Sequence, residues 1–309
     1  MRDFKKYSSK LFKLLINYNI NIKNMSVGLK IYICGILTGL FSLLKGKIII
    51  GLKRILLPVG YWRYPIFCYA YKQCLKMFKT KGENIKILDI GSPKLLALYL
   101  AINHNCRVYA TDLQDEEIWN MWQVYWNCWP KDFKKGQYIT EYQDGRNLSY
   151  PNEYFDIVFS ISVLEHIPNQ DDSQTMKEIQ RVLKKGGIAI IELPYSLKAY
   201  DTFLHQDIYE RKFEGKPVFY ERHYDEETLY KRIINPASQL KLKEKIIIGE
   251  RFPFERFWQK VPKLFGVWFY WSEPLISLLN HFHMYKQHIQ KDKSRNIKRA
   301  MSVTLVFTK

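Results

Sequence analysis

The sequence lacks the residue patterns that are typical of a disulfide framework, a metal site or a dinucleotide-binding site. Its five cysteines are scattered over 309 residues with no C-x-x-C pair and no accompanying histidine pattern. We therefore expect reduced thiols in a cytoplasmic protein and no bound metal. The G-x-G-x-x-G turn that seats a dinucleotide pyrophosphate on a helix N-terminus is also absent, which disfavours nicotinamide chemistry.

Acidic residues are almost missing from the first 81 positions, which hold sixteen lysines and arginines against one acid, Asp3, in a chain of net charge +18. Pro58–Pro65 reads as a linker because two prolines and a glycine interrupt it. Residues 1–64 are therefore interpreted as a basic, apolar and helical N-terminal extension. Such a segment suits an anionic membrane surface or nucleic acid, and a general lysine and isoleucine bias in composition is the alternative.

No apolar run reaches the roughly 20 residues that a membrane-spanning helix needs. Ile31–Leu44 is uncharged but is bounded by lysines, and Ile48–Leu57 follows with two basic residues inside it. This pattern favours an interfacial helix that holds the protein peripherally on an anionic leaflet. A transmembrane anchor and a helical cap packed on the domain are the two alternatives.

From Ile85 onward, short apolar runs alternate with segments of helical periodicity, a pattern typical of βαβ units. A helix over 65–79 leads into this region. Further helices are predicted at 94–103, 116–126 and 175–183, and strands at 85–90, 107–111, 138–142, 155–161, 188–193, 242–248 and 302–307. The expected architecture is α/β: a doubly wound, seven-stranded, mostly parallel sheet spanning residues 65–309, with an aromatic-rich insertion at 254–299.

Carboxylates follow three consecutive predicted strands. Asp89 ends the first in LDIGSP, Asp112 ends the second in VYATD, and Asp144 follows the third in EYQDGRNL. Aspartate is common at turns, so each position alone is weak evidence. Ligands of open α/β sheets bind beyond the carboxyl ends of the strands, where these three side chains would meet.

Four segments together resemble the class I S-adenosylmethionine-dependent methyltransferases. They are ILDIG, YATD, QDGRNLSYPNEYFDIVFSISVLEHIP and EIQRVLKKGGIAIIELPY, between about Ile85 and Pro194. The resemblance is closest to the small-molecule branch that includes ubiquinone- and menaquinone-type enzymes. It implies a Rossmann-like methyltransferase fold with S-adenosylmethionine as the cofactor.

The resemblance also implies a set of cofactor-binding residues. They are Asp89, Gly91 and Ser92 at the methionine end, Asp112 and Leu113 at the ribose, Asp144 and Gly145 at the adenine, Ser160 and Ile161 under the sulfonium, and Arg63 over the carboxylate. One departure concerns the first loop, which is usually G-x-G-x-G in this family and here retains only Gly91. Pro93 can begin a helix, so a tight strand-to-helix turn is still expected.

Methyl transfer is an in-line displacement, and it asks for a base only when the acceptor must lose a proton. By position, His166 in LEHIP is the candidate base, and a structural loop histidine is the alternative interpretation. His205, His223 and Tyr224 are weaker candidates, and Asp225 reads as a helix N-cap.

These observations predict methylation of a small-molecule or lipid-linked acceptor on O, N or C. The aromatic insertion, which includes Trp258, Trp268 and Trp271, suits a lipid boundary, a hydrophobic acceptor pocket or a packed subdomain. The alternative function is a non-catalytic, membrane-associated binding module of the same fold. Nucleic-acid methylation is disfavoured, because the charge sits in an apolar extension and no NPPY-type tetrad is present. The sequence predicts no oligomeric state.

Overall fold

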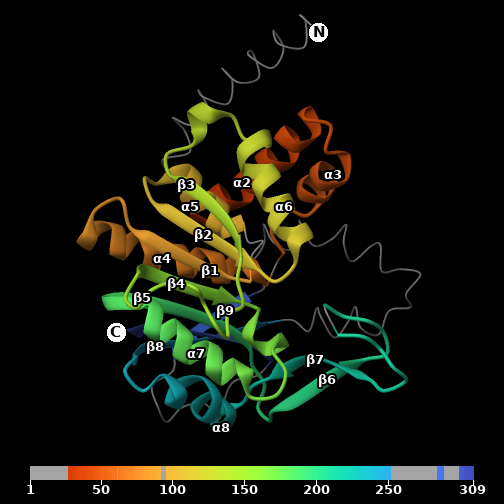
Figure 1. Ribbon diagram of the computed structural model, residues 1–309, viewed down its shortest axis with the longest axis vertical. Helices are drawn as coiled ribbons and strands as arrows, with labels where there is room; N and C mark the ends of the chain where they lie inside the picture. Colours follow the sequence, from red (N-terminus) through yellow and green to blue (C-terminus); the bar gives the residue numbers. More distant parts are fainter. Residues whose placement is uncertain (1–26, 61, 92–94, 210, 252–283, 289–298) are drawn as a thin grey trace, which may run out of the picture.

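The computed structural model describes residues 27–60, 62–91, 95–209, 211–251, 284–288 and 299–309 (Figure 1). In this part of the chain, eight strands form one sheet in the order β3-β2-β1-β4-β5-β10-β8-β9, and β6 and β7 form a separate hairpin. The doubly wound α/β fold predicted from the sequence is confirmed. Ser92 and most of the predicted insertion, including its tryptophans, lie outside the described residues.

The parallel half of the sheet contains β1 (Lys86–Ile90), β2 (Arg107–Asp112), β3 (Gln137–Tyr142), β4 (Phe155–Ile161) and β5 (Leu183–Pro194). Strand β1 pairs with β2 on one side and with β4 on the other. The strand order therefore reverses between β1 and β4, and this reversal opens a crevice at their carboxyl ends.

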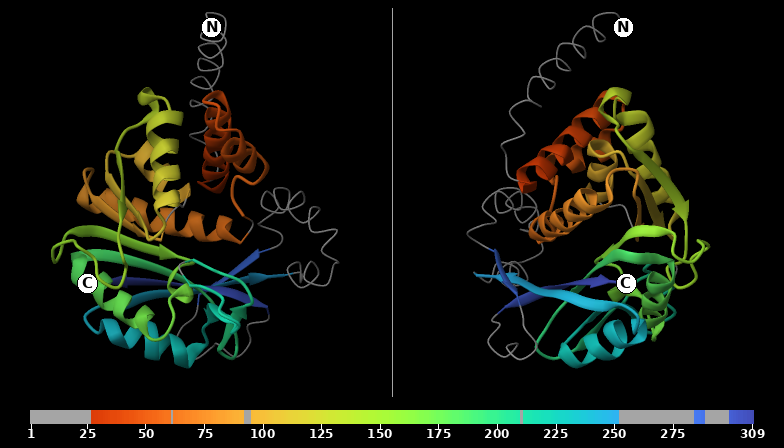
Figure 2. Two further views of the ribbon diagram at one scale, coloured as in Figure 1. Left: turned by 45° about the vertical axis from the view of Figure 1, so that its right-hand side comes forward. Right: turned by 90° about the vertical axis from the view of Figure 1, so that its left-hand side faces the viewer.

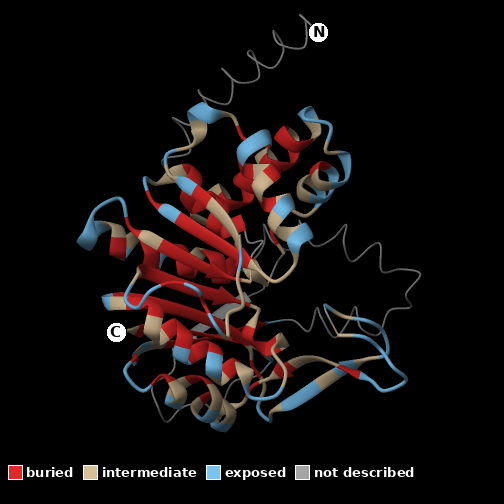
Figure 3. Ribbon diagram, viewed as in Figure 1, coloured by how far each residue is buried: buried red, intermediate tan, exposed pale blue. Residues whose placement is uncertain are grey.

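Alternate residues of the strands enter two separate hydrophobic cores. In β1, Ile87 packs in one core and Leu88 in the other, and in β4 Ile157 and Val158 divide in the same way. The first core includes α4 (Arg63–Lys81) and α5 (Leu95–Asn103), and the second includes α7 (Asp171–Val182). Figures 2 and 3 show the resulting three layers, with buried strands between two layers of helices.

The N-terminal helices pack on the first of these layers. Helix α2 (Val27–Leu44) places Ile31 and Phe41 in the same core as α4 and α5, and Trp129 donates a hydrogen bond from Nε1 to Thr38 Oγ1 at 3.1 Å. Helix α3 (Ile48–Leu56) packs on α2. In the described part of the chain one helix, α2, is long and apolar enough to cross a membrane, and half of it is buried inside the molecule.

The antiparallel half of the sheet contains β10 (Ala300–Thr308), which pairs with both β5 and β8 (Lys241–Glu250). An eighth strand, β9 (Met284–His288), lies within the predicted insertion and pairs with β8. Two predicted boundaries were wrong. Helix α7 begins at Asp171, not at Thr175, and β5 begins at Leu183, because the Gly186–Gly187 pair continues the strand and does not separate it from the helix.

The hairpin of β6 (Tyr200–Leu204) and β7 (Val218–His223) was not predicted. A buried carboxylate, Asp172 at the start of α7, ties this hairpin to the domain. It accepts hydrogen bonds from Arg222 of β7 at 3.1 Å, from the Tyr224 hydroxyl at 2.8 Å and from Arg232 at 2.8 Å. Asp225 then caps α8 (Glu226–Leu229), as predicted, by accepting from the Thr228 backbone N–H.

Candidate cofactor and acceptor site

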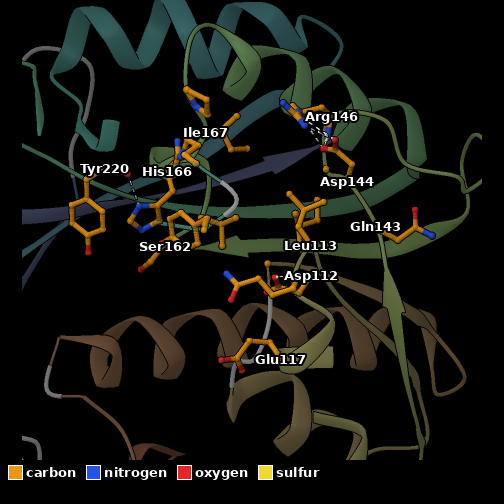
Figure 4. A pocket seen from close by; sticks show the side chains of 18 of the residues that line it. Asp112, Leu113, Glu117, Gln143, Asp144, Arg146, Ser162, His166, Ile167 and Tyr220 are labelled. Atoms are coloured by element: carbon orange, nitrogen blue, oxygen red, sulfur yellow. Dashed lines mark hydrogen bonds and ion pairs between the residues drawn. The ribbon is translucent and has the colours of Figure 1, made fainter. Parts of the chain in front are cut away.

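A cavity of about 570 Å³ lies at the carboxyl ends of β1, β2 and β4, where the strand order reverses. This volume suits a ligand of cofactor size. Seven of the predicted site residues line it: Arg63, Gly91, Asp112, Leu113, Asp144, Gly145 and His166. Figure 4 shows Asp112 and Asp144 toward one side of the cavity and His166 and Tyr220 toward the other.

Gly91 forms the floor of the cavity where β1 ends. Its backbone has a φ of +69°, and a Cβ atom placed there would lie 2.5 Å from both methyl carbons of Val163. Only glycine fits this position without strain and a clash. The predicted neighbour Asp89 is fully buried and does not line the cavity. The backbone geometry at position 91 therefore requires the glycine that the sequence has there.

Asp112, the last residue of β2, lines the cavity beside Leu113. One of its carboxylate oxygens accepts the Gln114 backbone N–H at 3.0 Å, which fixes the orientation of the side chain. Glu117 of α6 (Asp115–Gln123) adds a second carboxylate to the same wall. This wall offers fixed acceptor oxygens for a ligand that carries hydroxyl donors or positive charge.

Asp144 stands on the same wall beyond β3 and is held by an arginine. Arg146 contacts both carboxylate oxygens, at 2.7–3.0 Å, and also reaches Asp171 at 3.2 Å. The hydrogen bonds from Arg146 lower the pKa of Asp144 and outweigh the opposing effect of burial, so this carboxylate is ionised. Gly145 lies beside it, with Ile90 and Thr175 directly behind its backbone.

Ser160 and Ile161 do not line the cavity, because they are fully buried within β4 between its two neighbouring strands. The next two residues, Ser162 and Val163, line it instead. Ser162 has a φ of 53°, and its hydroxyl donates to the buried carboxylate of Glu192 at 2.8 Å. The strand ends at Ile161 as predicted, but the residues that reach the cavity are the two that follow it.

His166 lies opposite the carboxylates and is oriented by a backbone carbonyl. Its Nδ1 lies 2.9 Å from the carbonyl oxygen of Tyr220. Because a carbonyl oxygen only accepts, Nδ1 carries the hydrogen, and the lone pair of the neutral ring is on Nε2. Nε2 lies 3.8 Å from the carboxylate of Glu165. The ring is therefore held in the tautomer that can accept a proton at Nε2.

The hairpin completes the far side of the cavity with Tyr209, Arg211 and Tyr220. Arg211 donates to the carbonyl oxygen of His166 at 3.0 Å, and burial lowers its pKa. Both tyrosine rings pack within 5.4 Å of the His166 ring, and burial raises the pKa of both phenols. Two chemically different walls therefore face each other.

We call Gly91, Asp112, Asp144 and Gly145 the strand-end wall. We call His166, Tyr209, Arg211 and Tyr220 the hairpin wall.

The other histidine and tyrosine candidates lie away from the cavity. His223 lies 3.0 Å from a carboxylate oxygen of Glu221 and stacks on Tyr200. Tyr224 is fully buried and donates to Asp172, so its role is structural. His205 packs near Phe213 on the hairpin.

The sequence interpretation did not include several cavity residues, among them Glu117, Arg146, Ser162, Arg211 and Tyr220. Arg146 could have been found from its place two residues after Asp144, within reach of that carboxylate. Arg211 and Tyr220 had no local signal, because the fold of the hairpin brings them to the cavity.

The strand-end wall fits S-adenosylmethionine, a cation that carries a ribose diol and an adenine. Asp112 and Glu117 would supply acceptors for the diol, and Asp144 would supply an ionised carboxylate for the adenine. Arg63, at the first position of α4, lines the cavity and would be a cation for the amino-acid carboxylate.

Comparisons with known proteins agree with this fold. Residues 88–191 match the protein family described as a methyltransferase domain. The [4+2]-cyclase SpnF has a similar structure, with a TM-score of 0.50 and 14% identity over 81% of this chain and 86% of that chain. No curated protein matches the sequence.

Two further solved structures are described as S-adenosylmethionine-dependent methyltransferases. The protein from Methanosarcina mazei is 15% identical over 74% of this chain and 93% of its own, with a TM-score of 0.45. The protein from Clostridium acetobutylicum is 16% identical over 85% and 98%, also with a TM-score of 0.45. The family match over 88–191 includes most of the residues that line the cavity, so the site lies in a segment that is similar to a methyltransferase domain.

Proposed function

We propose that the chain transfers the methyl group of S-adenosylmethionine to a small-molecule or lipid-linked acceptor that enters along the hairpin wall. The observation that carries this proposal is the pairing of the two walls around one cavity. The strand-end wall has the groups that hold the cofactor. The hairpin wall has a histidine in a proton-accepting tautomer beside aromatic rings that suit an organic acceptor.

When bound, S-adenosylmethionine supplies an electrophilic methyl group on a sulfonium. The chain's own residues align the two reactants, and this alignment provides much of the rate increase. His166 Nε2 accepts the proton of a hydroxyl or ammonium acceptor as that group becomes a nucleophile. Tyr209 and Tyr220 pack against the His166 ring, with ring centroids 5.4 and 5.1 Å from its own.

A binding module without methyl transfer is the second candidate, and one observation favours it. SpnF, whose structure is similar to this chain over most of both lengths, is described as a [4+2]-cyclase. The same fold therefore supports chemistry other than methylation, and the fold alone does not decide the reaction.

Transfer of label from methyl-tritiated S-adenosylmethionine tests the proposal. The full chain is incubated with fractionated cell extracts, one of polar metabolites and one of lipids, and the label in each is counted. We expect transfer into one fraction, and a fall of about 100-fold in His166→Ala. The matched control His205→Ala should retain the rate, since His205 lies off the cavity. Cofactor binding without any labelled product would favour the binding module.

A further inference from the structure

Helix α3 exposes its apolar side chains to the outside of the molecule. The exposed fractions are 62% for Ile48, 83% for Ile49, 48% for Leu52 and 50% for Leu56. We call these four residues the apolar face of α3. Most surface helices turn such residues inward and expose polar ones, so this orientation is the reverse of the usual arrangement.

The inner side of α3 is already occupied. Gly51 is buried, and a Cβ atom there would lie 2.5 Å from the Leu43 side chain and 3.0 Å from the Gly39 carbonyl oxygen, both on α2. Residues 48, 52 and 56 follow at intervals of four, and residue 49 is adjacent, so all four project from the side away from α2. Figures 1 and 3 show α3 at the edge of the molecule. The contact with α2 therefore fixes the apolar face outward.

The charges that neighbour this face along the sequence have a single sign. Lys45 and Lys47 precede α3, Lys53 is exposed within it, and no acidic residue occurs between positions 4 and 82. Apolar side chains flanked by lysines suit a bilayer with anionic headgroups. The apolar side chains enter the boundary between headgroups and acyl chains, and the lysines contact the lipid phosphates. A symmetric contact between two copies would place lysines against lysines. Nucleic acid would leave the apolar side chains in water.

The same helix carries a charged residue, Arg54, that interacts electrostatically with residues of the cavity. Burial lowers the pKa of Arg54, the charge of Arg63 lowers it further, and Glu117 opposes this effect. Arg63 and Glu117 both line the cavity, so Arg54 lies within electrostatic reach of two of its residues. The helix that carries the apolar face is therefore close to the site.

We propose that the apolar face of α3 inserts into the headgroup boundary of an anionic membrane, with Lys45, Lys47 and Lys53 on the lipid phosphates. The membrane contact stands independently of the reaction. Its consequence, that the acceptor belongs to the lipid-linked class, rests on the proposed function. In this arrangement α2 stays packed in the protein core and does not cross the bilayer.

Sedimentation of the full chain with vesicles tests the proposal. We expect binding to phosphatidylcholine vesicles that contain phosphatidylglycerol, and much weaker binding to phosphatidylcholine alone. The double variant Ile49→Glu, Leu52→Glu should reduce partitioning about tenfold or more, because it removes both apolar insertions and adds two anionic groups. The control Leu197→Glu, at a side chain 69% exposed elsewhere, should bind as the wild type does.

Three results would overturn the proposal. The first is no binding to anionic vesicles. The second is unchanged binding by the double variant, which would place the contact in another segment such as a spanning α2. The third is a lipid-free dimer that the double variant dissociates in sedimentation velocity, which would make the face a contact between copies. Calorimetry of the same variants with S-adenosylmethionine separates the two proposals, since a chain that fails to bind the cofactor can still bind vesicles.

Discussion

The two walls of the cavity are built in different ways. The strand-end wall is part of the central sheet, because its residues follow directly from β1, β2 and β3. Most of the hairpin wall comes from a two-stranded element outside that sheet, and the buried Asp172 network connects this element to the domain. The first wall therefore follows from the sheet topology, whereas the second depends on the packing of the hairpin.

This difference indicates that the strand-end wall determines cofactor binding and that the hairpin wall determines which acceptor is bound. Residues placed by strand ends meet wherever this sheet topology occurs, so their position does not depend on the hairpin. Residues placed by an added hairpin can vary without disturbing the sheet. We therefore expect substitutions in the two walls to have separable effects.

The largest expected effect concerns the anchor of the hairpin wall. Asp172→Asn removes a fully buried charge from between Arg222 and Arg232, and should cost about 3–5 kcal/mol of unfolding free energy. Urea unfolding measures the loss. The neighbour Asp171, with a side chain 37% exposed, is the matched control, and Asp171→Asn should cost under about 1 kcal/mol. Equal losses would mean that the buried network does not hold the hairpin.

The next effect concerns the floor of the strand-end wall. Gly91→Ala should cost about 1–2 kcal/mol for the left-handed backbone, and about 1–3 kcal/mol more for the clash with Val163. Gly186→Ala has a similar φ of +70° with open space around it, so only the backbone cost applies. Thermal unfolding and cofactor calorimetry compare the two variants. A loss in Gly91→Ala no greater than in Gly186→Ala would remove the argument for a close backbone approach.

A smaller effect is expected at the ribose position. Asp112→Asn keeps an acceptor oxygen but loses the charge, so affinity for S-adenosylmethionine should fall about tenfold. The control is Glu116→Gln, because Glu116 is an exposed acid in α6 that does not line the cavity. Titration calorimetry measures both variants. Unchanged affinity in Asp112→Asn would remove this residue from the cofactor contacts.

The smallest effect on cofactor affinity should come from the hairpin wall. Arg211→Ala should bind S-adenosylmethionine within about twofold of the wild type while the transfer of label to the acceptor falls. Filter binding measures the affinity for the cofactor, and the tritium assay measures the transfer of label to the acceptor. If cofactor affinity fell as far as it does in Asp112→Asn, the separation between the walls would not hold.

The sequence was sufficient for the parts of the molecule that depend on local periodicity. All seven predicted strands exist, and two of the three carboxylates that follow consecutive strands, Asp112 and Asp144, line the cavity. The end of β4 was predicted correctly, but Ser160 and Ile161 were wrongly expected at the cavity, because a pattern does not show which residues near a strand end face the ligand. The hairpin was missed because β6 and β7 are short, carry mixed polar residues and have a bulge between them. Tyr209, Arg211 and Tyr220 reach the cavity only through its long-range packing.

Titration of the full-length chain with S-adenosylmethionine in a calorimeter tests the central claim most directly. The account predicts saturable binding at one site per chain, and competition by S-adenosylhomocysteine for that site. The titration is repeated at several temperatures, because a binding enthalpy near zero at one temperature would hide real binding. An absence of binding heat at millimolar cofactor at every temperature would contradict the account.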